Sequence, residues 1–70
     1  MDYGRLVRVS KHRGDPKAVS YIVAVAEAGR AIELIRSQAA DPDDEVEDLG
    51  RVSDTLIEAL RLGSGRFMRA

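Results

Sequence analysis

Apolar residues recur at helical spacing through the first half of the chain. From Tyr21 to Ile35 the steps run four, three, four and three residues, through Val25, Ala28 and Ile32. This spacing is typical of the face that one helix packs against another. It predicts a helix over residues 15–40, with charged side chains on the opposite side.

A second seam with the same spacing follows in the other half of the chain. It begins at Val46 and runs through Leu49, Ser53 and Leu56 to Leu60. This pattern predicts a helix over residues 42–62. Gly63 directly follows, and a glycine is the usual residue for the left-handed turn that ends a helix.

Both predicted helices begin at an Asp–Pro pair. Asp15 and Asp41 stand where an N-cap residue would accept hydrogen bonds from unpaired backbone N–H groups, and a proline follows each of them. Proline is well suited to the first helical position because its missing N–H would have no partner there. The short connection around Asp41 predicts that the two helices are antiparallel.

The fold class that follows is all-α: an antiparallel helical hairpin over 15–62, with a basic N-terminal arm over 1–14 and a flexible C-terminal tail over 63–70. The aliphatic surface is wider than two helices can cover for each other, so we expect a homodimer in the form of a four-helix bundle. The residues expected to form the core and the self-association surface are Tyr21, Ile22, Val25, Ala28, Gly29, Ile32, Ile35, Val46, Leu49, Val52, Leu56, Ile57 and Leu60.

The arm permits one alternative. Residues 5–10 alternate partially and include β-branched side chains, so they also fit a short strand with Arg5, Val7 and Val9 on one face. A strand followed by two helices is similar in element order to ribbon-helix-helix DNA-binding dimers. The first predicted helix is too long for that family.

Length and composition narrow the class of protein. Seventy residues allow one domain, and 44% hydrophobic with 33% charged residues is typical of a folded chain. There is no cysteine and a single histidine, which excludes disulfides and a histidine-rich metal site. No apolar run approaches the roughly 18 residues of a membrane span, so we expect a cytoplasmic protein without membrane contact.

Charge is segregated along the chain although the net charge is −1. Residues 1–17 carry +3, residues 41–58 carry −7 and residues 59–70 carry +3, counted from the sequence. In a hairpin this predicts a rod with one basic and one acidic end. The basic end suggests phosphate or nucleic-acid contact. The residues available for it are Arg5, Arg8, Lys11, Arg13 and Lys17.

Candidate chemistry is sparse. The acidic run over 41–45 lacks the glycine and the final glutamate of a calcium loop, and no group orients His12 beside Ser10. We therefore expect no catalytic residue, metal or cofactor. Phe67 and Met68 stand between two arginines and offer an anchor for a partner, although the segment is predicted to be a tail. The sequence indicates a non-catalytic protein-interaction or adaptor module, with a small nucleic-acid-binding regulator as the alternative.

Overall fold

The computed structural model describes residues 3–70 and shows a four-stranded sheet with two short helices. The prediction of an all-α hairpin is therefore wrong, and so is the four-helix bundle built on it. In chain order the elements are β1 (Gly4–Ser10), β2 (Val19–Val23), α1 (Ala28–Gln38), β3 (Glu45–Val52), α2 (Asp54–Ala59) and β4 (Phe67–Arg69).

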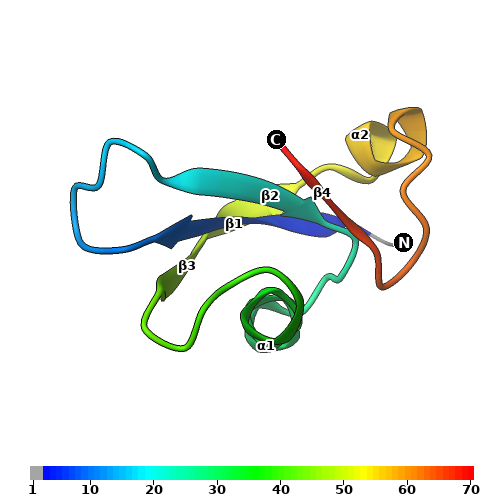
Figure 1. Cartoon of the computed structure of the whole chain (residues 1–70). Coiled ribbons are helices and arrows are strands. Elements are labelled where there is room, and N and C mark those ends of the chain that lie inside the picture. Colours follow the sequence, from blue (N-terminus) through cyan, green and yellow to red (C-terminus); the bar gives the residue numbers. More distant parts are fainter. Residues whose placement is uncertain (1–2) are drawn as a thin grey trace.

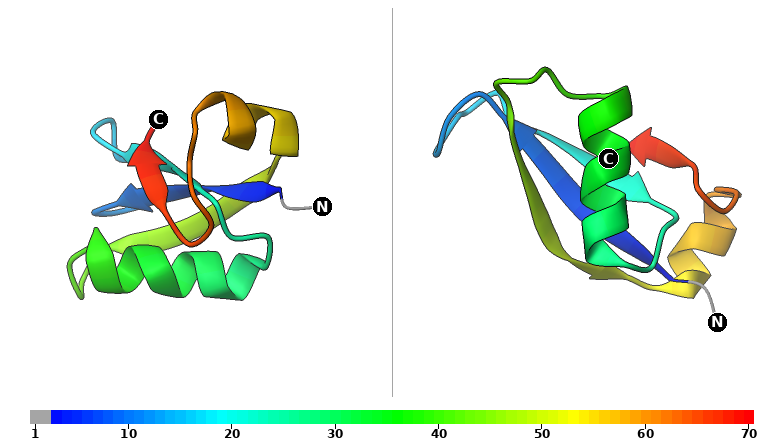
Figure 2. Two further views of the ribbon diagram at one scale, coloured as in Figure 1. Left: turned by 90° about the vertical axis from the view of Figure 1, so that its right-hand side faces the viewer. Right: turned by 90° about the horizontal axis from the view of Figure 1, so that it is seen from below.

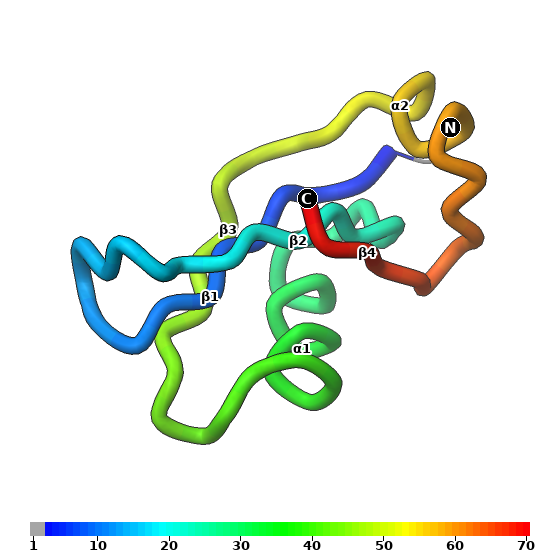
Figure 3. The backbone as a smooth tube through the Cα atoms, turned by 45° about the horizontal axis from the view of Figure 1, so that its top comes forward, coloured from blue at the N-terminus to red at the C-terminus, as the bar shows by residue number. Residues whose placement is uncertain are grey.

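The sheet has the order β3-β1-β2-β4, and every neighbouring pair is antiparallel. The two helices lie on opposite sides of it, with α1 below and α2 above in Figure 1. The tube in Figure 3 shows the β1–β2 loop, residues 11–18, projecting from one end of the molecule. Strands β3 and β4 form the two edges, so each has one side without a neighbouring strand.

The larger core lies between the sheet and α1. Val7, Val23, Ala31 and Ile35 are fully buried there, and Val9 is 9% exposed. Val7 and Val9 point to the same face because alternate residues of a strand share a face. Of the two possibilities left open for the N-terminal arm, the structure shows the short strand, with these valines on one face, and not the flexible arm.

A smaller core lies on the other face, under α2. Ala24, Val52 and Ile57 are buried there, and the half-buried side chains of Leu6 and Ile22 pack against them. The large apolar residues of β1 and all of those of β2 except Val19 therefore pack in one of the two cores. The four-helix bundle that was expected to cover the apolar surface does not exist in this fold, and the homodimer stays a prediction.

Strand β2 lies within the stretch predicted as a helix because it is central. Tyr21 and Val23 pack on the α1 core, whereas Ile22 packs on the α2 core. A strand buried on both faces is apolar at successive positions, and periodicity alone does not separate it from a buried helix. The predicted helix over 15–40 is real only over Ala28–Gln38, and Glu27 is its N-cap, accepting from the backbone N–H of Gly29 and Arg30.

The second predicted helix, over 42–62, combines a strand and a short helix. The register between β1 and β3 shifts between Leu6 and Val7, which leaves an extra residue in β3 near Gly50, whose φ is 130°. Such a bulge is a feature of strands. Ser53 is the N-cap of α2, and its side chain accepts from the backbone N–H of Leu56.

The two Asp–Pro pairs are not helix starts but lie in turns, the first between β1 and β2 and the second between α1 and β3. Asp15 accepts from the backbone N–H groups of Lys11 and Lys17, which closes the β1–β2 loop. The backbone N–H of Asp41 donates to the side chain of Asp44 at 2.9 Å. Aspartate favours such local turns for the same reason that it favours N-caps, because its oxygens accept from nearby N–H groups.

The residues predicted for the helical seam have different environments. Ile35, Val52 and Ile57 are buried, while Leu49 and Leu56 are 41% and 42% exposed. Gly29 is exposed. The half-buried members are Tyr21, Ile22, Val25, Ala28, Ile32, Val46 and Leu60. No helix within residues 3–70 is long and apolar enough to cross a membrane.

Candidate functional site

The basic residues near the N-terminus are largely neutralised by acidic residues of β3. The guanidinium of Arg5 donates to both carboxylate oxygens of Asp48, at 3.0 and 2.5 Å. Arg8 pairs with Glu47 at 2.5 Å. The predicted rod with a basic and an acidic end is wrong, because β1 and β3 are neighbours and bring the two kinds of charge together.

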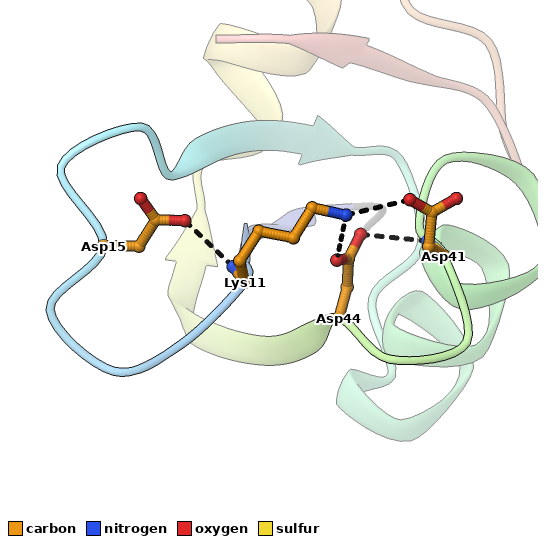
Figure 4. Close-up of polar contacts among 4 residues, drawn as sticks. All are labelled: Lys11, Asp15, Asp41 and Asp44. Atoms are coloured by element: carbon orange, nitrogen blue, oxygen red, sulfur yellow. Dashed lines mark hydrogen bonds and ion pairs between the residues drawn. The ribbon is translucent and has the colours of Figure 1, made fainter.

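Lys11 joins two loops (Figure 4). Its ammonium group lies 2.9 Å from Asp41 and 2.7 Å from Asp44, which precede β3. This contact, together with the Asp41 N–H, holds the pKa of Asp44 below its usual range. The Arg5 guanidinium does the same for the pKa of Asp48. These pairs tie the β1–β2 loop and β1 to the segment after α1, so their evident role is structural.

The other two residues of the predicted basic site, Arg13 and Lys17, are exposed in the β1–β2 loop. His12 is exposed in the same loop, with its Nδ1 3.1 Å from the Arg13 carbonyl oxygen. Across the described residues no three side chains come together in a way that would hold a metal ion. The structure brings Arg8 and Arg13 to one hollow that also contains Asp44, Glu45 and Glu47, so these basic residues do not form a patch of their own.

A shallow groove of about 640 Å³ lies between α1 and the residues that flank β2 and β4. Val25, just after β2, and Leu34 of α1 give it an apolar base, and both pack against the larger core. The right-hand view of Figure 2, seen from below, shows β4 to one side of α1. The remaining lining residues are Arg30, Glu33, Arg36, Ser37 and Gly65.

Strand β4 is held against β2 by an aromatic contact. Phe67 lies opposite Val23 in the register, and its ring meets that of Tyr21 edge-on, with centroids 5.7 Å apart. Both rings are half-buried and pack against the larger core. Edge-to-face aromatic pairs of this kind contribute beyond the area that they bury. The aromatic pair therefore fixes β4 as the outer strand of the sheet.

The free edge of β4 presents unpaired backbone groups. The carbonyl of Arg66 accepts from the N–H of Ala24 at 2.8 Å, and the N–H of Ala70 also donates to β2 at 2.8 Å. Successive residues of a strand direct their backbone groups to opposite sides. The N–H and C=O groups of Phe67 and Arg69 therefore point away from β2, where the described chain places no further strand.

The surroundings of this edge are positively charged. Arg30 and Arg36 of α1 are exposed at the groove, and Arg66 and Arg69 are exposed at β4. Glu33 is the acidic residue of the lining. The groove and the adjoining edge, which we call the β4 site, thus combine an apolar base, strand-pairing groups and a surplus of cations.

Sequence reasoning identified little of this site. The placement of Phe67 between arginines was noted as an anchor, but the segment was expected to be a flexible tail and is instead β4. Arg30 and Leu34 lie on a helix that was predicted, yet their common groove depends on where β4 lies. The chain matches no protein-family model, no curated protein and no solved structure among those with which it was compared.

Proposed function

We propose that the protein is a non-catalytic protein-interaction module that takes an extended, acidic segment of a partner as an added strand on β4. The observation that carries this proposal is the free edge of β4, where Phe67 and Arg69 offer backbone donors and acceptors beside an apolar groove. Strand addition to an exposed edge is a general mode of peptide recognition, in which main-chain hydrogen bonds give affinity and side-chain pockets give specificity.

The charges of the site select the class of segment. Four exposed arginines surround the edge and groove, with one glutamate among them, so carboxylates of the partner are favoured over cations. An apolar residue of the segment would lie on Val25 and Leu34. Each added backbone hydrogen bond contributes about 0.5–1.5 kcal/mol net, so the short edge supports weak, reversible binding.

The test measures binding of a labelled extended peptide with alternating acidic and apolar residues by fluorescence anisotropy. Arg69→Pro removes an outward N–H while sparing the bonds to β2, and Arg69→Ala removes the same charge but keeps the N–H. We expect Arg69→Pro to weaken binding well beyond Arg69→Ala, and Lys17→Ala, in the β1–β2 loop, to leave it unchanged. Equal affinity of the proline and alanine variants would refute strand addition.

Binding of nucleic acid stays a prediction with less support. Three of the five residues proposed for it, Arg5, Arg8 and Lys11, are engaged with carboxylates. Phosphate contact would have to displace these pairs. A gel shift with DNA or RNA at low salt, weakening steeply as salt rises, would favour the regulator over the interaction module. The cytoplasmic location likewise remains a prediction.

A further inference from the structure

We propose that the acidic strand received at the β4 site is β3 of a second copy of the same chain. This inference rests on the proposed function and names its partner. The two edges of one sheet would then join head to tail, β4 of one copy against β3 of the next. Three features support it: the backbone groups of β3, the direction of the two strands, and their opposite charge.

The free edge of β3 presents the backbone groups of Val46 and Asp48. Successive residues of a strand direct their backbone hydrogen-bonding groups to opposite sides, so alternate residues of β2 bond to β4 and the residues between them bond to β1. The β2 partner of Val7 is one of the residues that bond to β1. Val7 therefore bonds to β2, and its neighbour Arg8 bonds to β3. Arg8 lies opposite Glu47 in the register, so the backbone groups of Glu47 point inward to β1. The groups of the two residues beside Glu47 consequently point outward.

The bulge limits this edge to a short regular stretch. The register of β3 shifts directly after Asp48, as Leu6 lies opposite Gly50 but Val7 opposite Asp48. Bulges of this kind are a common way to end pairing along an exposed edge. The regular part of the free edge therefore has two outward residues, as β4 does, and the two edges match in length.

The directions of the strands also match. Because each neighbouring pair in the order β3-β1-β2-β4 is antiparallel, β4 runs opposite to β3 within one sheet. Two copies placed side by side in the same orientation thus form an antiparallel β4–β3 pair. Both α1 helices then lie on the same face of a continuous sheet.

Charge favours this arrangement over its alternatives. Glu45 and Glu47 are exposed on β3, whereas Arg66 and Arg69 are exposed at β4. If Phe67 pairs with Asp48 and Arg69 with Val46, Arg66 lies diagonal to Glu47 on one face, within reach of its side chain, and would share the Glu47 carboxylate with Arg8. Pairing β3 with β3, or β4 with β4, would instead bring like charges together. Attraction between the unlike edges β3 and β4, together with repulsion between two like edges, favours a head-to-tail contact.

A contact between two different edges does not close on itself unless the copies form a ring, so it propagates. The assembly is therefore expected to grow with protein concentration. It is also expected to weaken with salt, because the paired charges are exposed and screened.

The experiment measures the solution mass by light scattering between 10 µM and 1 mM at low salt. The variant Arg66→Glu/Arg69→Glu blocks the β4 edge, and Glu45→Lys/Glu47→Lys blocks the β3 edge. We expect the wild-type mass to rise at least twofold above 7.7 kDa, and each double variant to stay at the mass of one chain. A 1:1 mixture of the two variants should regain the higher mass.

The control variant Lys17→Glu/Arg61→Glu makes the same charge change at two exposed positions outside both strand edges and should assemble like the wild type. Circular dichroism establishes that each variant is folded. A wild-type mass of one chain at 1 mM, or a mixture that stays monomeric, overturns the inference. If the acidic peptide still binds in that case, the proposed function stands and only the identity of its partner is wrong; if the peptide fails as well, both fall.

Discussion

Replacing Gly4 with alanine tests the sheet directly, because this residue lies where β1, β2 and α2 meet. A Cβ atom at Gly4 would stand 2.8 Å from Cδ1 of Ile57 and would overlap the carbonyl oxygen of Val23. The Ile57 side chain has some freedom to move. The carbonyl does not, because Val23 is paired with β1 and β4 on its two sides.

The expected loss in the free energy of unfolding follows from the cost of overpacking a core, which is about 1–3 kcal/mol and is larger where the backbone must shift. A chain of this length has a free energy of unfolding of roughly 3.5–10 kcal/mol, so the loss is a large fraction. For a domain of this size each kcal/mol lowers the melting temperature by about 4–8 °C. We therefore expect Gly4→Ala to lower it by roughly 5–20 °C.

The assay is thermal and urea unfolding followed by circular dichroism, with Gly63→Ala as the matched control. A Cβ at Gly63 would meet Cγ of Arg66 at 3.6 Å, an ordinary contact. The control should therefore melt within a few degrees of the wild type. In an all-helical hairpin Gly4 would lie in an arm and the substitution would have no effect. Equal stability of Gly4→Ala and Gly63→Ala would thus contradict the packing described here.

Two further expectations concern the core and the ion pairs. Ile35→Ala should cost about 2–5 kcal/mol because the side chain is fully buried, whereas Leu56→Asp should cost less than about 1 kcal/mol because Leu56 is 42% exposed; urea midpoints that ranked them in the reverse order would show that the core is misplaced. The pKa values of Asp44 and Asp48 are lowered by Lys11 and Arg5, so their stabilisation is complete above the unfolded pKa near 4 and is lost as the pH falls through the lower folded values. Melting temperatures measured from pH 7 to pH 2 should fall in acid, and Asp48→Asn should make this fall smaller. An equal fall in the variant and the wild type would argue against the Arg5–Asp48 pair.

The positions of several local features could be predicted from the sequence, although the type of secondary structure was not always the one predicted. The partial alternation over residues 5–10 left a short strand open as an alternative to a flexible arm, and this segment is β1. The Asp–Pro pairs at 15 and 41 marked real changes of direction, because aspartate satisfies nearby N–H groups in turns as well as in caps. The spacing from Ala28 to Ile35 lies in α1, although the helix was predicted to begin at residue 15 and begins at Ala28.

The candidate site could not be predicted from local patterns in the sequence. The outward backbone groups of Phe67 and Arg69 exist only because β4 pairs with β2, which lies more than forty residues earlier in the chain. The groove at Leu34 needs both α1 and the approach to β4. A long-range pairing of this kind leaves no periodic signal in either segment.

What the sequence alone determined about this protein is therefore where its chain bends, which segments alternate, and that it carries separated blocks of charge. Which segments became strands was decided by tertiary structure. Tyr21 and Ile22 face two different cores, so β2 is apolar at successive positions and imitates a helix face. The charge blocks that implied a two-ended rod cancel across β1 and β3. Burial on both faces of a central strand removes the alternation that distinguishes strand from helix, and neighbouring strands bring together charges that are distant in sequence.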